Sequence, residues 1–396
     1  MAQAKRATAM ERVKLRRELV LGLPVGISVE GARKIESVVE YLYMFRVATL
    51  EQLTRCVPGE TVRRMRYWLE RYPYIERSEV SVERYDVATR KWIHPRKLGV
   101  YSLTAEALIA YEMAMELGDK GYTYGKTKTE YKPSNIENAL FPIELYTRAL
   151  EANQGSQMAW VSNQYVATEL RDEKYLKKGE SLSTSGFINL GDEGMWGIGT
   201  YLHRVSSVLK HTKKTFPAQF AYVLGGIMLV RNDYFGRVQE ITYQSEQPKG
   251  VHNNQYYRFV PYEFSLEHPK WFLGILRKNR WLVLDALFEN IRQRGGVVEQ
   301  VQYSKEIQGS SHEGFRFRVT HAADETGDRR VEYVDTTYGA SVVEFISLLS
   351  PKFKVENVEH VLYVVEPGEV PVYERIVQRK GMAGIQFRLI DWPGGK

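Results

Sequence analysis

The chain has 396 residues, a length that predicts two or three domains because single domains usually span roughly 100–200 residues. Its 43% hydrophobic and 26% charged residues exclude a disordered chain, and its net charge of +7 is compatible with a polyanionic partner. The single cysteine, Cys56, excludes an internal disulfide, and the longest apolar run nearly free of charge, Phe220–Val230, is shorter than the roughly 20 residues of a membrane-spanning helix.

Residues 1–27 form a basic N-terminal segment, and its basic residues all precede the break Gly22-Leu23-Pro24. The segment lacks the pattern of a secretory signal, so we expect a cytoplasmic protein with no membrane segment. It has two interpretations, a solvated tail or an arm that grips phosphates or a minor groove. Its basic residues are Lys5, Arg6, Arg12, Lys14, Arg16 and Arg17.

Three helices are predicted between residues 28 and 72. The first runs from Ser28 to about Phe45, and its apolar residues recur at three- and four-residue steps, which places them on one face. They are Ile35, Val38, Val39, Leu42 and Phe45. Thr49 predicts the cap of a short second helix, Leu50–Cys56, and the turn Val57-Pro58-Gly59 leads to a third helix, Glu60–Tyr72.

A hairpin and a fourth helix follow. Residues Ile75–Tyr85 predict a strand, Asp86–Lys91 a polar tip and Trp92–Leu103 the return strand. Three helices followed by a basic hairpin is the element order of a winged helix-turn-helix, which we assign to residues 28–118. The fourth helix, Ala105–Leu117, has Leu108, Ile109 and Met113 on one side. Such a helix packs back on its domain or dimerises it, so a homodimer remains open.

Positive charge concentrates on the third helix and the hairpin. Residues 63–97 contain ten lysines or arginines and five acidic residues, an excess of five positive charges in a chain whose net charge is +7. A helix in the major groove needs such side chains to reach base edges and phosphates, and a basic hairpin can reach flanking phosphates. The predicted contacts with double-stranded DNA are Thr61, Arg63, Arg64, Arg66, Tyr67, Arg71, Arg84, Arg90, Lys91, Arg96 and Lys97.

The rest of the chain predicts a linker and mixed α/β structure. Residues 119–136 read as a linker, residues 137–280 as an α/β middle region of unclear role, and residues 281–396 as a further α/β domain. The last domain has the order helix, three strands, helix, strand, which resembles the core of PD-(D/E)xK endonucleases. Its predicted elements are Trp281–Gln293, Val297–Tyr303, Phe315–Val319, Arg330–Val334, Ala340–Leu349 and Val358–Val365.

The nuclease-like region lacks the residues of an active nuclease. Such enzymes bind Mg²⁺ with an acid on the second strand and a Glu-x-Lys on the third. Here Arg316 and Arg318 occupy the second strand, and Val334 stands where the lysine is expected after Glu332. We therefore expect a degenerate core with no catalytic residue, metal or cofactor. The alternative is a nicking or cleaving nuclease with an unusual site, built from Asp285, Glu299, Glu332 and Asp335.

Other patterns are weaker signals. His203 and His211 lack companions at metal-ligand spacing, and Gly194–Gly199 lacks the Lys-Ser/Thr that completes a phosphate loop. His252 precedes Tyr256 and Tyr257, but one histidine does not make the metal pair that relaxases need. None of these patterns predicts an enzyme.

Two segments of the predicted winged helix resemble a known family. They are residues 43–53, with the sequence Tyr-Met-Phe-Arg-Val-Ala-Thr-Leu-Glu-Gln-Leu, and residues 62–69, with Val-Arg-Arg-Met-Arg-Tyr-Trp-Leu. Together with Tyr101-Ser102-Leu103-Thr104, they are similar to the replication-relaxation family of Gram-positive plasmids and mobile elements. The resemblance covers about 80 residues and rests on motifs that other winged helices share. It implies a winged helix fused to a divergent endonuclease-like domain, with a role in plasmid replication and DNA relaxation.

The sequence as a whole predicts a DNA-binding protein of a plasmid, phage or mobile element. We expect it to act by binding DNA in replication, maintenance or transcriptional control. Two other classes remain open, a Mg²⁺-dependent nuclease and a protein-interaction scaffold whose winged helix no longer binds DNA. Cleavage of supercoiled plasmid separates the first from DNA binding, and salt-sensitive DNA affinity separates the second.

Overall fold

The structure is a computed structural model of a mixed α+β protein that divides into two compact units, Met1–Gly191 and Asp192–Lys396. No helix among the described residues is long and apolar enough to cross a membrane. The predicted basic segment and residues 119–132 of the predicted linker lie outside the description. The structure describes residues 29–94, 97–115, 133–153, 157–174, 176, 182, 184–200, 224–238, 257–277, 279–300, 317–336, 359–364, 370–379 and 385–389.

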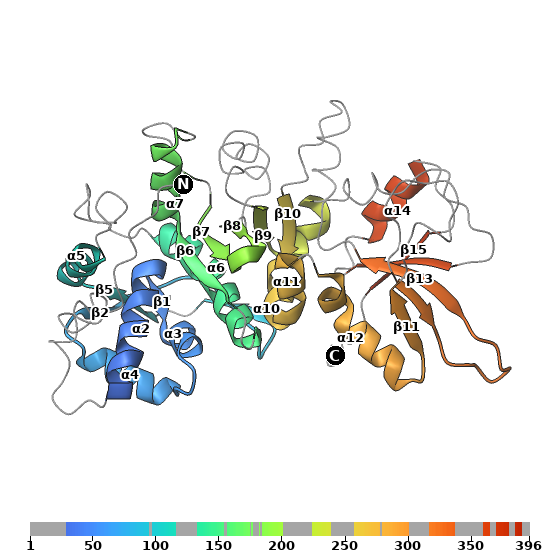
Figure 1. The fold of residues 1–396 in the computed structure, drawn as a ribbon, viewed down its shortest axis with the longest axis horizontal. Helices are drawn as coiled ribbons and strands as arrows, with labels where there is room; N and C mark the ends of the chain where they lie inside the picture. The colour runs from blue at the N-terminus through green and yellow to red at the C-terminus, as the bar shows by residue number, and fades with distance from the viewer. Residues whose placement is uncertain are drawn as a thin grey trace. The chain divides into compact units, whose positions relative to one another are not determined.

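The first unit opens with three helices and a two-residue strand (Figure 1). In chain order they are α2 (Val29–Phe45), β1 (Ala48–Thr49), α3 (Leu50–Cys56) and α4 (Val62–Arg71). The apolar face predicted for the first helix is confirmed. Its five residues are all buried: Ile35, Val38, Val39, Leu42 and Phe45.

The bounds and the cap of α3 are also as predicted. Thr49 Oγ1 accepts a hydrogen bond from the backbone N–H of Gln52 at 3.3 Å, and Gln52 Oε1 accepts one from the backbone N–H of Thr49 at 2.9 Å. This reciprocal capping box satisfies two amides that the helix itself leaves unpaired. The turn to α4 passes through Gly59 at φ +78°, a conformation that favours glycine.

The two predicted strands pair in antiparallel fashion around the predicted tip, but each is interrupted, so the pairing divides into two separate ladders. β2 (Ile75–Val80) pairs with β5 (Leu98–Leu103), and β3 (Arg84–Asp86) pairs with β4 (Lys91–Ile93) at the tip. β1 adds to the other edge of β5, giving an antiparallel sheet of order β1-β5-β2. The interruption falls at Val82, which leaves the strand and is 1% exposed.

The predicted fourth helix is described as α5 (Ala105–Ala114). Ile109 is 46% exposed, whereas Ala107 and Tyr111 are buried. Tyr111 stacks on Tyr43 of α2 with ring centroids 4.3 Å apart, and the Tyr43 hydroxyl donates a hydrogen bond to Glu112 Oε1 at 3.2 Å. These contacts with α2 orient α5. Because α5 is apolar on most sides, its sequence pattern does not indicate which face is buried.

The remainder of the first unit contains α6 (Pro133–Ala152), β6 (Ala159–Ser162), α7 (Asn163–Asp172) and β7 (Gly186–Asn189). In the predicted α/β middle region, the strand β6 is followed directly by the helix α7. The change occurs at Ser162, whose Oγ accepts a hydrogen bond from the backbone N–H of Tyr165 at 3.2 Å. β6 and β7 are antiparallel, and a Cβ at Gly186 would lie 2.1 Å from the Trp160 ring.

In the second unit, three neighbouring strands lie in the order β10-β9-β8. β8, β9 and β10 are parallel to one another, and the Gly-rich segment 194–199 lies mostly in β8. Residues 201–223 of the predicted middle region lie outside the described residues. The remaining elements of this region are the turn η2 (Gly191–Glu193), β8 (Met195–Thr200), β9 (Gly225–Val230), β10 (Tyr257–Pro261), α10 (Tyr262–Glu267) and α11 (Pro269–Leu276).

The predicted helix of the C-terminal region is confirmed as α12 (Arg280–Gln293). Asn279 caps its first turn, and Gly295 follows it at φ +81°. Asp285 and Glu289 are exposed, as the helical spacing indicates. The face that packs inward comprises Leu284, Leu287, Phe288 and Ile291.

The last sheet runs in chain order, β11-β12-β13-β14-β15. β12 is antiparallel to both neighbours, whereas β13, β14 and β15 are parallel. The helix predicted at Ala340–Leu349 lies outside the described residues, and α14 and β15 were not predicted. The bounds are β11 (Val297–Gln300), β12 (Phe317–Thr320), β13 (Val331–Thr336), β14 (Glu359–Val364), α14 (Val370–Arg379) and β15 (Ile385–Leu389).

Candidate nucleic-acid interface

α4 buries one narrow face and exposes the rest. Met65 and Leu69 are 1% and 3% exposed and anchor the helix on the core of the first unit. Thr61 Oγ1 accepts a hydrogen bond from the backbone N–H of Arg64 at 3.3 Å, so its hydroxyl caps the helix. The predicted contact residues of this element are all exposed: Thr61, Arg63, Arg64, Arg66, Tyr67 and Arg71.

A row of three side chains runs along the outward face of α4. Arg63, Tyr67 and Arg71 are four residues apart, so a helix of 3.6 residues per turn places them nearly above one another. The Arg71 guanidinium carbon lies 4.0 Å from the centre of the Tyr67 ring, and Arg71 Nη1 donates a hydrogen bond to the Tyr67 hydroxyl. The row therefore combines two positive charges with an aromatic ring that is 47% exposed.

The other arginines of α4 have different surroundings. Arg64 Nε lies 3.6 Å from Glu60, whose carboxylate also pairs with Lys34 Nζ at 2.7 Å. Among the described residues, neither Arg63 nor Arg66 forms an ion pair. The charge of Arg64 is partly compensated, whereas those of Arg63 and Arg66 are available to a polyanion.

The tip hairpin β3–β4 exposes a second group of cations. Asp86 shapes the tip by accepting hydrogen bonds from the backbone N–H of Ala88 and the hydroxyl of Thr89, and the Thr89 bond is the main cause that lowers the Asp86 pKa. Arg90 adopts a left-handed φ of +53°, and both Arg90 and Lys91 are exposed.

The remaining predicted wing residues are half-buried, paired or undescribed. Arg84 is half-buried, and Lys97 Nζ pairs with Glu79 at 3.1 Å. Arg96 lies outside the described residues. The exposed cations of the tip are therefore Arg90 and Lys91, and these are the residues of this hairpin best placed to meet a phosphate.

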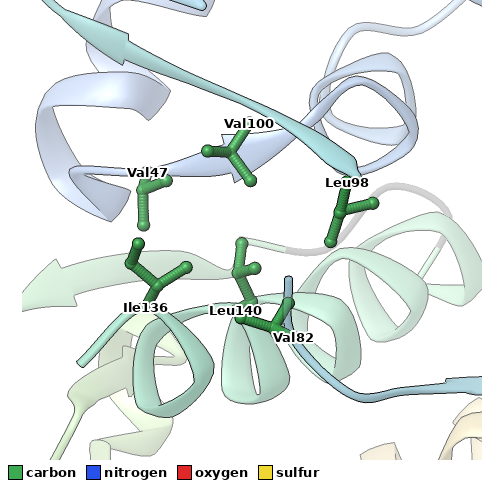
Figure 2. Close-up of a cluster of buried hydrophobic side chains, with 6 residues drawn as sticks. All are labelled: Val47, Val82, Leu98, Val100, Ile136 and Leu140. Carbon is green, nitrogen blue, oxygen red and sulfur yellow. The ribbon is translucent and has the colours of Figure 1, made fainter. Parts of the chain in front are cut away.

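The tip hairpin is anchored on α6. Val82 packs with Leu98 and Val100 of β5 against Ile136 and Leu140 of α6, as Figure 2 shows. Trp92 of β4 makes an edge contact with Phe141, with ring centroids 5.8 Å apart. The core of the three helices thus continues into α6, and no local pattern in the sequence indicates this contact between segments far apart in the chain.

Polar contacts join α6 to α3 as well. Gln52 Nε2 donates a hydrogen bond to the Leu140 carbonyl at 3.0 Å, and Arg55 Nη1 pairs with Glu144 at 2.8 Å. Arg148 Nε also contacts Glu144 at 2.8 Å. Burial by itself raises the Glu144 pKa, but the two arginines outweigh it and hold the pKa below its ordinary value.

Of the four acids of the alternative nuclease site, the structure describes the side chains of Asp285, Glu299 and Glu332. Asp285 and Glu299 are exposed, and Glu299 lies 3.9 Å from Arg318. The side chain of Asp335 and all of Arg316 lie outside the description. Among the described residues, no group of three or more His, Cys, Asp or Glu side chains is placed to hold a metal ion.

Glu332, the central acid of that alternative, is buried and surrounded by basic groups. Its Oε1 contacts Arg330 and Arg388, and its Oε2 lies 2.9 Å from His321 Nε2. A carboxylate with two guanidinium partners could bind a divalent cation only after those ion pairs had been broken. Arg388 is 56 residues away in sequence, so local sequence patterns could not have identified it.

The single cysteine is not placed for chemistry. Cys56 lies at the end of α3 and is buried, and burial raises its thiol pKa well above the ordinary value.

Comparisons of the chain with protein-family models, with curated protein sequences and with solved structures gave no match.

Proposed function

We propose that the protein binds double-stranded DNA through a winged helix-turn-helix formed by residues 28–118, with α4 in the major groove. The single observation that carries this proposal is the outward face of α4. Four arginines and Tyr67 are exposed there, while Met65 and Leu69 hold the helix to the core. An exposed helix with this charge is what contact with base edges and phosphates requires.

The topology around α4 supports the proposal. A winged helix has three helices, a short strand after the first helix, and a hairpin that pairs with that strand. The order α2, β1, α3, α4, β2, β5 and the sheet order β1-β5-β2 fit this arrangement. The tip hairpin β3–β4 would then be the end of the wing, with Arg90 and Lys91 reaching a flanking phosphate.

We further propose that the protein serves replication, maintenance or transcriptional control of a plasmid, phage or mobile element. This proposal rests on the resemblance of residues 43–53, 62–69 and 101–104 to the replication-relaxation family. The chemistry of α4 is compatible with each of these roles, because all of them begin with recognition of a DNA site.

Alanine substitutions on α4 test the binding proposal. Arg63→Ala with Arg66→Ala should weaken binding of full-length protein to fluorescein-labelled duplexes by at least about tenfold, because each phosphate or base contact contributes roughly 1 kcal/mol or more. Arg294→Ala, which removes an exposed arginine after α12, should leave binding unchanged. Equal affinity of the double variant and the wild type would remove α4 from the interface.

For residues 281–396 we propose a nuclease-like core without nuclease activity. The order α12, β11, β12, β13, β14 fits that core, and the cations around Glu332 argue against metal binding. Purified protein should leave supercoiled plasmid intact in Mg²⁺ or Mn²⁺, as judged by agarose gels. Nicking that disappears in Glu332→Ala but persists in Glu289→Ala, a change at an exposed position of α12, would instead establish an enzyme.

A further inference from the structure

The interaction between Tyr67 and Arg71 distinguishes Arg71 from the other arginines of α4. The guanidinium lies 4.0 Å from the centre of the Tyr67 ring, within the range of a cation–π interaction, and its Nη1 also donates a hydrogen bond to the ring hydroxyl. Two contacts on one exposed side chain restrict its rotamers before any partner arrives. Neither Arg63 nor Arg66 makes a ring contact or a side-chain hydrogen bond of this kind with a described residue.

The contact also moves the charge of Arg71 along the helix. Side chains of a helix point toward its N-terminus, and Arg71 reaches back one turn to Tyr67. The guanidinium of a residue in the last turn thereby lies over the middle of the exposed face. The N-terminal and middle turns of a recognition helix are the parts that meet base edges in the major groove.

An oriented, planar guanidinium suits one base in particular. Guanine presents two acceptors, O6 and N7, at its major-groove edge, and the arginine fork matches both at once. A phosphate contact needs charge more than orientation, because phosphate oxygens accept hydrogen bonds from many directions. Holding Arg71 in place therefore benefits base reading more than backbone binding.

We propose that Tyr67 and Arg71 form a base-reading pair, in which Arg71 contacts guanine and Tyr67 is a positioning residue that holds the guanidinium. This inference rests on the proposed function, since it requires α4 to lie in the major groove. It assigns sequence specificity to this pair, and it assigns to Arg63 and Arg66 a larger share of sequence-independent affinity.

The probe is a duplex library with a randomised core, from which full-length wild type and variants each select their preferred sites. Wild type should select a motif with a fixed guanine, and exchanging that G·C pair for A·T should lower its affinity about 5- to 100-fold. Arg71→Lys keeps the charge but not the fork, so it should still bind the selected duplex while losing most of this discrimination.

Variants of Tyr67 separate positioning from charge. Tyr67→Ala should lose the guanine preference in part, and Tyr67→Phe, which keeps the ring, should retain more of it. Arg66→Ala is the matched control, because it should weaken binding to all duplexes alike and leave the motif unchanged. Arg66, Tyr67 and Arg71 are all exposed, and thermal melts followed by circular dichroism check that each variant remains folded.

The outcomes distinguish this inference from the proposed function. Salt-sensitive binding of wild type, with a guanine preference that survives in both Arg71→Lys and Tyr67→Ala, overturns the base-reading pair and leaves DNA binding standing. Binding that selects no motif does the same. Wild type that binds no duplex overturns the proposed function and this inference with it.

Discussion

Glu144 of α6 illustrates how a single side chain links two helices and makes their contact depend on pH. Its side chain is 20% exposed and contacts Arg55 of α3 and Arg148 of its own helix. Burial opposes ionisation, but the arginines hold the Glu144 pKa below its ordinary value in the folded protein. A carboxyl whose folded pKa is depressed contributes stability above its unfolded pKa and loses that contribution as the pH falls through its folded value.

Replacing Glu144 by glutamine should therefore lower the free energy of unfolding by about 1–3 kcal/mol at pH 7, because two half-buried arginines lose their partner. The difference from wild type should shrink as the pH falls below about 4.5, since wild type then loses the same interaction. Urea denaturation at several pH values measures both effects. Glu151→Gln, an exposed change on the same helix, is the control, and a difference that stays constant with pH would contradict the assignment.

At the scale of the elements, the sequence predicts those parts that depend on local patterns. The apolar face of α2, the capping box of α3 and the glycine after α12 are each set by residues within a few positions of one another. The exposure of the α4 arginines follows in the same way from Met65 and Leu69. The interruption of the hairpin strands and the ion pairs of the two buried glutamates could not be predicted in this way. Val82, Glu144 and Glu332 contact partners that lie far away in sequence.

The anchoring of the tip hairpin is the element-scale feature easiest to test. Val82→Ala should destabilise the protein by about 2 kcal/mol, since it removes buried methyl groups from the cluster of β5 and α6. Hydrogen exchange at residues 84–93 should become faster as the hairpin loses its anchor. Val62→Ala, at a position that is 42% exposed, should change stability by less than about 0.5 kcal/mol. Unchanged exchange in the hairpin would show that Val82 does not hold it.

At the scale of the whole molecule, charge is distributed unevenly. The net charge of the chain is +7, and residues 63–97 carry an excess of five positive charges. The basic charges of the last sheet are used differently, since Arg330 and Arg388 pair with the buried Glu332. The excess of basic over acidic residues is therefore concentrated in the part of the chain to which we assign DNA binding.

The dependence of DNA affinity on salt tests this assignment most directly. A protein that neutralises several phosphates releases their counterions, so the logarithm of its binding constant falls linearly with the logarithm of salt concentration. We predict a steep negative slope for full-length protein on duplex DNA. In Arg90→Ala with Lys91→Ala, the slope should be flatter by roughly one unit for each phosphate that the variant no longer neutralises, with affinity reduced alike for all sequences. Between 50 and 200 mM salt, several phosphate contacts typically weaken binding by roughly 10³–10⁵. A slope near zero over this range, or no measurable binding to duplex DNA within it, would contradict the account.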